Sequence, residues 1–198
     1  MPISTVIAPG DLRAQISAWR KKEKKVAFVP TMGALHEGHI SLVEEARKHA
    51  DHVVVSIFVN PMQFGPNEDF ASYPRMLAQD ISKLENNHVD LVFVPNAADI
   101  YPEGFQTVVS NTELSDILCG RFRPGHFNGV LTVVAKLFHL VNPNFSLLGK
   151  KDYQQFMLIS KMAKDLCFPL GVLGCPTMRE SDGLAMSSRN LRLTREYR

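Results

Sequence analysis

Apolar residues along this chain form short continuous runs that alternate with stripes of helical spacing. The runs at 26–29, 52–59 and 90–94 are rich in β-branched and aromatic residues, and prolines at 61 and 95 follow the last two. Such runs predict strands that are buried on both faces, as in a parallel sheet. The runs at 145–148 and 170–173 predict two further strands.

Helical periodicity fills the intervals between these runs. Apolar positions recur every three or four residues over 40–46 and 77–84, and again over 127–141 and 156–166. Strands and helices therefore alternate along the chain. This succession predicts an α/β fold, a doubly wound parallel sheet of Rossmann-like type with right-handed crossovers.

Composition and charge narrow the classes of function. The 198 residues are 45% hydrophobic, and 22 basic against 20 acidic side chains give a net charge of +2. So small a charge gives no general attraction for nucleic acid or for an anionic membrane. The apolar runs are far shorter than the roughly 20 residues of a membrane helix, and the first residues lack a secretory-signal pattern. We therefore expect no nucleic-acid partner, no membrane span and a cytoplasmic protein.

Cysteine spacing and the last residues add two expectations. Cys119, Cys167 and Cys175 have no C-x-x-C spacing, so we expect reduced thiols rather than a disulfide framework or a thiolate zinc site. Thr194 is typical of a helix N-cap, but too few residues follow it for two helical turns. We expect the chain to be a truncated form of a longer protein.

The strongest candidate for chemistry is the segment PTMGALHEGH at 30–39, directly after the first predicted strand. Ligands of an open α/β sheet bind outside the carboxyl ends of its strands. The spacing of Gly33 and Gly38 resembles a P-loop, but the lysine that should follow Gly38 is absent. H-E-x-H is likewise one residue short of a zinc-protease motif. We interpret His36 and His39 as phosphate ligands that stabilise charge during attack on a nucleotide α-phosphorus; two purely structural histidines are the alternative.

Two further segments follow predicted strands. The amides of Asn60 and Gln63 can hydrogen-bond a neutral polar substrate, although a plain loop explains them equally well. At 149–155, Lys151 can reach a polyphosphate, and Asp152 can either cap the helix or bind Mg²⁺. Two lysines oppose the dipole at a helix N-terminus, and a bound anion would remove that conflict.

Two polar turns complete the candidates. Ser187, Ser188 and Arg189 would make a phosphate clamp, although such a stretch is more often a simple turn. Arg123 and His126 flank a Pro-Gly turn that leads into a helix, and a binding role and a structural role explain them equally well.

Six segments together resemble the pantoate–β-alanine ligase family. In order, they are PTMGALHEGH from 30, FVNPMQFGPNED from 58, YPR from 73, RPGHFNGV from 123, GKKDYQQ from 149 and DGLAMSSRN from 182. The resemblance implies a HIGH-type nucleotidyltransferase in which the serine-rich segment stands in place of a KMSKS loop. It also implies an AMP-forming ligase of pantothenate biosynthesis. ATP and pantoate would form pantoyl adenylate and pyrophosphate, and β-alanine would then displace AMP to give pantothenate.

The same resemblance implies roles for individual residues. The catalytic residues would be His36, His39 and Lys151. The ATP site would comprise Pro30, Met32, His36, His39, Gly149, Lys151, Asp152, Met178, Ser187, Ser188 and Arg189. Pantoate would bind to Asn60, Gln63, Gln155, Arg123 and His126. Asp152 would share in binding Mg²⁺, and the protein would be a homodimer.

The resemblance also implies two parts in the chain. Residues 1–175 would form the Rossmann-like domain that binds nucleotide and pantoate, and 176–198 would be the start of a C-terminal lid that is largely missing. Water would then reach the adenylate, so we expect weak binding and slow turnover. One alternative is a related cofactor nucleotidyltransferase, which would not need Gln63 together with Gln155. The other is a nucleotide-binding domain that binds ATP without pantoate-dependent pyrophosphate release.

Overall fold

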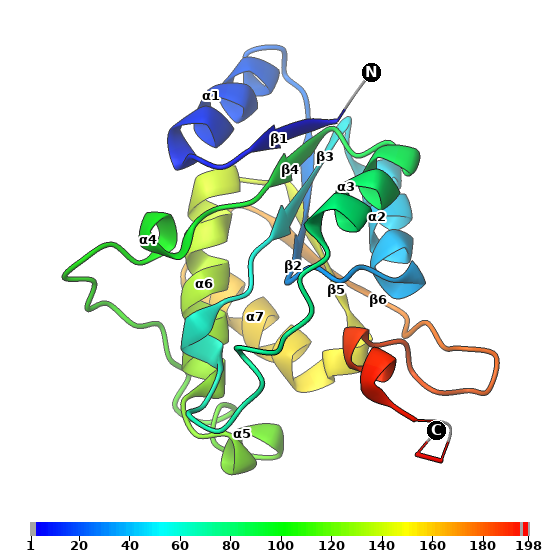
Figure 1. Ribbon diagram of the computed structural model, residues 1–198. Coiled ribbons are helices and arrows are strands. Elements are labelled where there is room, and N and C mark those ends of the chain that lie inside the picture. The colour runs from blue at the N-terminus through cyan, green and yellow to red at the C-terminus, as the bar shows by residue number, and fades with distance from the viewer. Residues whose placement is uncertain (1–2, 195, 198) are drawn as a thin grey trace.

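The protein is described by a computed structural model in which residues 3–194, 196 and 197 are placed. Six strands form one sheet in the order β1-β4-β3-β2-β5-β6, and every neighbouring pair is parallel (Figure 1). The strands are β1 (Ser4–Val6), β2 (Val26–Thr31), β3 (His52–Ile57), β4 (Leu91–Phe93), β5 (Phe145–Gly149) and β6 (Gly171–Cys175). The predicted doubly wound parallel sheet is confirmed.

Helices connect these strands. The α-helices are α1 (Pro9–Arg20), α2 (Glu37–His49), α3 (Leu77–Asn86), α4 (Ala97–Ile100), α5 (Cys119–Phe122), α6 (His126–Val141) and α7 (Tyr153–Asp165). Short 3-10 turns are η1 (Pro61–Gln63), η2 (Lys150–Asp152) and η3 (Ser188–Arg192). All four predicted helices and all five predicted strands are present, with ends that differ by a few residues.

Strand β1 and helix α1 lie before residue 26, where no element is predicted from the sequence. Strand β1 has three residues and pairs with β4 at the edge of the sheet, so it is too short to show a period of two. Helix α1 buries Leu12, Ile16 and Trp19, which follow the helical spacing i, i+4, i+7. That stripe was a readable signal that the sequence analysis did not use.

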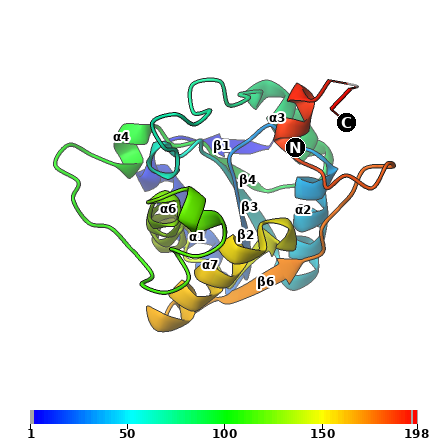
Figure 2. The ribbon, with the colours of Figure 1, turned by 90° about the horizontal axis from the view of Figure 1, so that it is seen from below.

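The sheet is covered on both faces because its side chains alternate. Val26 and Phe28 of β2 pack into the core beneath α1, α6 and α7. Ala27 and Val29 face the other way, into the core beneath α2 and α3. Figure 2 shows the sheet between these two layers of helices. Burial on both faces explains why the strands read as continuous apolar runs.

The order of strands in the sheet changes side between β2 and β5, which is the topological switch point. Strands β3 and β4 extend the sheet on one side of β2, whereas β5 and β6 extend it on the other side. The carboxyl ends of β2 and β5 therefore flank a crevice, which is where ligands of open α/β sheets bind. After β6, residues 176–193 return to this edge of the sheet, and Ser188 donates a hydrogen bond to the Ala34 carbonyl.

Three remaining features concern the classes of protein considered from the sequence. No helix in the described part of the chain is both long and apolar enough to cross a membrane. Cys119, Cys167 and Cys175 are free thiols, and the last of these is buried. The N-cap pattern at Thr194 concerns residues 195–198, of which 195 and 198 lie outside the described residues.

Candidate active site

A cavity lies at the crevice between the ends of β2 and β5. Its walls come from these strand ends, the loops that follow them, one face of α6 and the returning segment 176–189. The predicted site residues that line it are Pro30, Met32, His36, His39, Gln63, Gly149, Lys151, Asp152, Gln155, Met178, Ser187, Ser188 and Arg189. Asn60, Arg123 and His126 do not line it. The fold thus gathers residues from four distant segments at one place.

The loop between β2 and α2 has a backbone shape that needs support. Gly33 and Ala34 have φ values of 83° and 50°, in the left-handed region that costs a residue such as alanine about 1–2 kcal/mol. The buried carboxylate of Asp80 on α3 accepts hydrogen bonds from the backbone N–H groups of Ala34 (2.8 Å) and Leu35 (2.7 Å). Lys83 donates to the Leu35 carbonyl. These contacts fix the point at which α2 begins.

His36 and His39 lie in the first turn of α2, with ring centroids 4.1 Å apart. His36 is the N-cap residue, and its Nδ1 accepts a hydrogen bond from the Gly38 N–H (3.1 Å). The Nδ1 atom of His39 accepts from the His36 N–H (3.3 Å). Because both Nδ1 atoms are acceptors, each neutral ring carries its proton on Nε2. Each imidazole in the cavity wall therefore has one N–H left to donate.

Both rings are neutral at pH 7. Burial, with the positive charges of Lys151 and Lys83, lowers the pKa of His36 to about 4. Burial, with His36 and the same two lysines, lowers the pKa of His39 to about 3. The two histidines can thus donate hydrogen bonds to an anion, while the fixed positive charge comes from Lys151.

Lys151 and Asp152 come from the turn between β5 and α7. Their charged atoms are 3.9 Å apart, and both side chains are more than one-third exposed. Asp152 occupies the N-cap position of α7, but its side chain makes no capping hydrogen bond. Of the two roles predicted for this carboxylate, capping is the one that the structure contradicts.

The carboxylates of the cavity limit how it could hold a metal ion. Among the described residues, Asp152 is the one acidic side chain in the cavity wall, and no group of three or more His, Cys, Asp or Glu side chains could hold a metal ion. Mg²⁺ is commonly bound by one or two carboxylates together with substrate phosphates. The donor set therefore fits a Mg²⁺ ion that is held chiefly by a nucleotide.

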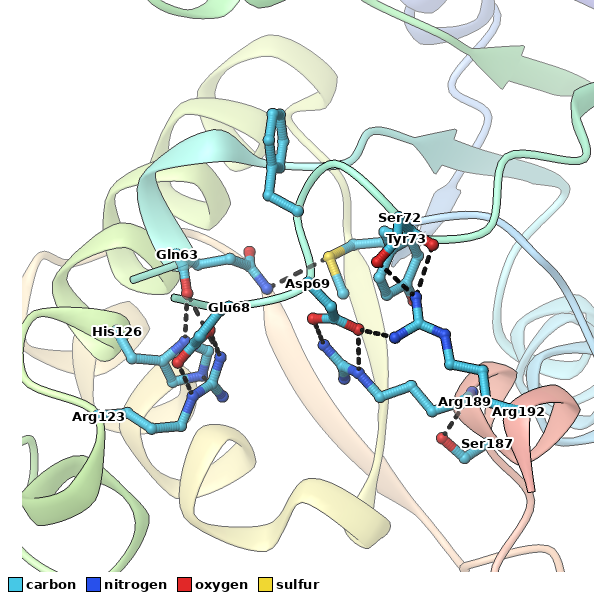
Figure 3. A network of polar contacts seen from close by, with 12 residues as sticks. Gln63, Glu68, Asp69, Ser72, Tyr73, Arg123, His126, Ser187, Arg189 and Arg192 are labelled. Atoms are coloured by element: carbon cyan, nitrogen blue, oxygen red, sulfur yellow. Dashed lines mark hydrogen bonds and ion pairs between the residues drawn. The ribbon is translucent and has the colours of Figure 1, made fainter. Parts of the chain in front are cut away.

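The returning segment covers the loop that contains the histidines. The Ser188 hydroxyl is buried and donates to the Ala34 carbonyl (2.9 Å), so it fixes backbone as well as lining the cavity. The Ser187 hydroxyl accepts from the Arg189 N–H (3.3 Å). The Arg189 guanidinium lies over the Tyr73 ring, 5.4 Å from its centroid, and pairs with Asp69 (Figure 3).

Gln63 is the polar group on the opposite side of the cavity. The amide of Asn60 donates to Gln63 Oε1 (3.0 Å) and to the Gly129 carbonyl (3.1 Å). The Tyr101 hydroxyl donates to Asn60 Oδ1 (2.7 Å). The hydrogen-bonding groups of Asn60 are thus all used within the protein, and one of them orients Gln63. The Gln63 Nε2 group contacts Met32 Sδ (3.3 Å), a weak acceptor that a ligand oxygen could replace.

The structure gives Arg123 and His126 partners outside the cavity. Arg123 forms an ion pair with Glu68, and its Nη1 lies 3.0 Å from His126 Nε2. The Nδ1 atom of buried His126 is 2.7 Å from the Gln63 carbonyl oxygen and donates to it. Both side chains therefore contact the backbone of Gln63 and reach the cavity only through that residue.

The sequence analysis missed the residue that supports the histidine loop. Asp80 is a charged residue on the buried stripe of α3, one turn before the buried Leu84. Buried acidic side chains are rare unless they are paired, so its position on that stripe was a usable signal. Glu68, Asp69 and Tyr73 entered only as parts of the family segments. Their roles depend on contacts across the fold, which no local pattern reveals.

Comparison with known proteins agrees with this arrangement. The family model described as pantoate-beta-alanine ligase matches residues 4–198. A pantothenate synthetase of Sulfurihydrogenibium sp. is 54% identical over 196 residues, which are 99% of this chain and 70% of that protein. A pantothenate synthetase of Desulfitobacterium hafniense is 56% identical over 187 residues, which are 94% of this chain and 66% of that protein. The chain thus spans about two-thirds of the length of these relatives.

Solved structures give the same result. The pantothenate synthetase of Thermus thermophilus superposes with a TM-score of 0.93 at 50% identity, over 98% of this chain and 69% of that one. The pantoate-beta-alanine ligase of Francisella tularensis, in complex with beta-gamma ATP and beta-alanine, also gives 0.93, at 46% identity over 98% of this chain and 74% of that one. Sequence, cavity and superposition agree, and the chain belongs to the pantoate–β-alanine ligase family.

Proposed function

We propose that this chain holds the site at which ATP and pantoate form pantoyl adenylate, and at which β-alanine then displaces AMP to give pantothenate. The family consists of ATP-dependent, AMP-forming ligases. One observation carries the proposal for this chain. The same cavity contains donors suited to a triphosphate, His36, His39 and Lys151, and two neutral amides, Gln63 and Gln155.

The first step needs positioning and charge neutralisation rather than a base. A carboxyl group has a pKa near 4, so pantoate reaches the site as a carboxylate. One carboxylate oxygen forms a bond to the α-phosphorus of ATP, and the bond from that phosphorus to the pyrophosphate oxygen breaks. The Nε2–H groups of His36 and His39 and the ammonium of Lys151 would stabilise the charge on the phosphate oxygens. Loss of one such donor typically costs about 3–4 kcal/mol of transition-state stabilisation.

The remaining nucleotide contacts are assigned on the same basis. Ser187, Ser188 and Arg189 would bind the triphosphate from the returning segment. Pro30, Gly149 and Met178 would shape the adenosine pocket, together with Met32. Among the described residues, no heavy atom other than those of Gly149 and its two chain neighbours lies within 4 Å of a Cβ atom built on Gly149. This space beside β5 is open to a ligand.

Mg²⁺ would enter with the nucleotide. It would supply charge neutralisation at the triphosphate when bound, and Asp152 is the residue of this chain that would share in holding it. Its carboxylate is available because it does not cap α7.

Gln63 and Gln155 would bind pantoate through hydrogen bonds to its hydroxyl and carboxylate oxygens. Asn60 would act by orienting Gln63, whereas Arg123 and His126 would act through the Gln63 backbone. The second step requires the neutral amine of β-alanine. Its nitrogen attacks the pantoyl carbonyl carbon, the bond from that carbon to the AMP phosphate oxygen breaks, and the nitrogen gives up one proton to water. Proximity within the site would favour this step.

Three further parts of the proposal rest on the family resemblance. Residues 1–175 would bind nucleotide and pantoate, and 176–198 would belong to the lid region. The active form would be a homodimer. The protein would work in the cytoplasm.

The proposed function is tested by pyrophosphate release with ATP and a choice of acceptors. We expect release with pantoate and none with pantetheine phosphate or nicotinate mononucleotide. The Gln63→Ala variant should raise KM for pantoate more than KM for ATP. Release with another acceptor would instead identify a related nucleotidyltransferase. ATP binding without pantoate-dependent release would identify a nucleotide-binding domain.

A further inference from the structure

The loop between η1 and α3 carries two adjacent carboxylates that are directed to opposite sides. Glu68 is directed toward Arg123 and His126, next to Gln63, and Asp69 is directed toward Arg189 and the returning segment (Figure 3). The function proposed above uses neither carboxylate. Each nevertheless contacts a group that borders one of the two proposed substrate subsites.

Glu68 supports the side of the cavity where Gln63 lies. Its carboxylate accepts from Nε (2.7 Å) and Nη2 of Arg123, which is a bidentate pair, and the two side chains are only about one-quarter exposed. This pairing sets the plane of the guanidinium. Nη1 of the same group then donates to His126 Nε2 (3.0 Å), and His126 Nδ1 donates to the Gln63 carbonyl (2.7 Å).

Arg123, held by Glu68, determines which nitrogen of His126 carries the proton. Arginine can only donate, so His126 Nε2 must accept and Nδ1 must hold the proton that is donated to Gln63. Burial is the main cause that lowers the pKa of His126, and a neutral ring with a single proton on Nδ1 agrees with this. Glu68 therefore holds Arg123, which reaches the Gln63 carbonyl both directly (3.5 Å) and through His126.

Asp69 supports the side of the cavity where a triphosphate would lie. Its two oxygens accept from Arg189 Nη2 and Nε, both at 2.9 Å, and one of them also accepts from Arg192 Nη1 (2.8 Å). Arg192 donates in addition to the Ser72 carbonyl (2.6 Å). The hydrogen bonds and charge of Arg189, with the charge of Arg192, lower the pKa of Asp69 to about 2 although burial opposes this.

The pairing leaves one edge of Arg189 available. Asp69 takes the Nε and Nη2 groups, and among the described residues Nη1 has no hydrogen-bond partner within the protein. The guanidinium is also held over the Tyr73 ring, and both residues line the cavity. An arginine that is fixed on one edge loses less conformational entropy when its other edge binds a phosphate oxygen.

We infer that Glu68 and Asp69 are positioning residues, one for each substrate. Glu68 orients Gln63 for pantoate through Arg123 and His126, and Asp69 orients Arg189 for the triphosphate of ATP. This inference rests on the proposed function, because it assigns the two sides of the cavity to those two ligands. It predicts that substitution of Glu68 affects the binding of pantoate, whereas substitution of its neighbour Asp69 affects the binding of ATP.

The test measures two dissociation constants by calorimetry for each variant, one for pantoate and one for a non-hydrolysable ATP analogue. Glu68→Gln and Asp69→Asn remove charge and keep shape. We expect Glu68→Gln to raise the dissociation constant for pantoate about tenfold and that for the ATP analogue less than about twofold. Asp69→Asn should show the reverse. In each variant the cause is the loss of charge-assisted hydrogen bonds. Asp51→Asn is the matched control: Asp51 pairs with Lys24 near the amino end of β3, and both constants should stay unchanged.

A second variant guards against loss of structure in Glu68→Gln. Arg123→Lys keeps a cation beside Glu68, but an ammonium lacks the planar group that donates to both Glu68 and His126. This variant should therefore also weaken the binding of pantoate and leave that of the ATP analogue unchanged. Melting temperatures show which variants are folded at the assay temperature.

The outcomes separate this inference from the proposed function. A wild-type protein that binds neither pantoate nor the ATP analogue would overturn the proposed function and this inference with it. A wild-type protein that binds both, with variants that weaken both ligands equally or neither, would overturn this inference alone. If the substitutions simply unfolded the loop, each variant would bind both ligands more weakly. If the two residues position different groups, each variant loses affinity for a different ligand.

Discussion

At the scale of single residues, several polar side chains of this site bind backbone groups rather than one another. Asp80 binds two backbone N–H groups, Ser188 and His126 donate to carbonyls, and His36 accepts from the first turn of its own helix. A side chain that is bonded to backbone is fixed in the frame of the fold. The cavity is thus shaped by buried polar residues that lie behind the groups that line it.

Asp80 provides the sharpest prediction of this kind. In Asp80→Asn one acceptor oxygen becomes an N–H₂ group that faces a buried backbone N–H, so one of the two bonds is lost. We expect the free energy of unfolding to fall by about 1–3 kcal/mol, with a lower melting temperature and weaker ATP binding. Denaturant titration measures the first effect, and Asp165→Asn, which changes an exposed carboxylate paired with Lys161, is the control. A melting curve for Asp80→Asn that matches the control would contradict the anchoring role.

The lowered pKa values of the two loop histidines predict how stability depends on pH. In the unfolded chain a histidine has a pKa near 6.5, whereas His36 and His39 have values of about 4 and about 3 in the folded protein. Between these limits the unfolded state binds more protons, so the free energy of unfolding falls as pH falls. The contribution is complete above about pH 6.5 and is lost progressively as pH falls through the folded pKa values.

We therefore expect the melting temperature to fall between pH 7 and pH 5, and to fall less in His36→Asn. Asparagine keeps an N-cap acceptor for the Gly38 N–H but does not titrate. His88→Asn, which changes an exposed histidine outside the site, is the matched control. Equal slopes for wild type and His36→Asn would show that protonation of His36 does not limit stability in this range.

The location of candidate residues could be predicted from the sequence better than the contacts that these residues make. The segment around His36 and His39 could be located because it follows a clear strand and precedes a clear helix. The contacts of Arg123 with Glu68 could not be predicted, because 55 positions separate the two residues and no spacing rule connects them. Asp80 lies between these cases, since its burial is readable from α3 but its partners are not.

At the scale of elements, the placement of Gln63 depends on close packing between η1 and α6. A Cβ atom on Gly129 would lie 2.6 Å from the Gln63 nitrogen and would also clash with the Met62 carbonyl. Both are backbone atoms, so the 3-10 turn itself would have to move. The glycine is therefore what lets the turn approach α6 closely enough for Asn60 to reach the Gly129 carbonyl.

The Gly129→Ala variant should displace η1 and weaken pantoate binding more than ATP binding. Overpacking of this kind costs about 1–3 kcal/mol of folding free energy. Gly10→Ala is the matched control: nothing lies within 4 Å of its added carbon, and it sits in the first turn of α1, so stability should be unchanged or slightly higher. Calorimetry with each ligand and denaturant titration measure both effects. Unchanged pantoate binding in Gly129→Ala would contradict this account of η1.

Element prediction succeeded where burial leaves a strong pattern and failed where it does not. Strand β3 is buried on both faces, and its apolar run identified it. Strand β1 pairs on one side only and has two exposed residues among its three, so its sequence carries almost no signal. Residues 102–118 also lack a pattern of buried positions. No helix or strand is predicted there, and the structure has none in this range.

At the scale of the whole molecule, the order of strands determines where the site lies. The reversal between β2 and β5 brings residues near 36 and residues near 151 to one crevice, and the returning segment 176–189 closes it from a third direction. A ligand in this cavity would contact segments from both halves of the sheet. Ligand binding should therefore stabilise the fold as a unit rather than one loop.

This predicts a thermal shift that separates two neighbouring glutamines of α7. A ligand at about 100 times its dissociation constant adds about 2.7 kcal/mol to the free energy of unfolding, which is about 5–10 °C for a chain of this size. Gln155 lines the cavity, whereas Gln154 binds the Leu114 and Ile117 carbonyls outside it. Gln155→Ala should lose the shift with pantoate and keep the shift with an ATP analogue.

Gln154→Ala should begin from a lower melting temperature and keep both shifts, since it loses hydrogen bonds to the loop before α5 and to Cys119 at the start of α5. The two variants differ by one position on the same helical turn, so helix propensity and local sequence cannot explain a difference between them. Full pantoate shifts in both variants would place pantoate away from the first turn of α7. Loss of both ligands' shifts in Gln154→Ala would instead mean that the loop before α5 and the start of α5 support the cavity, because the variant removes the hydrogen bonds to both.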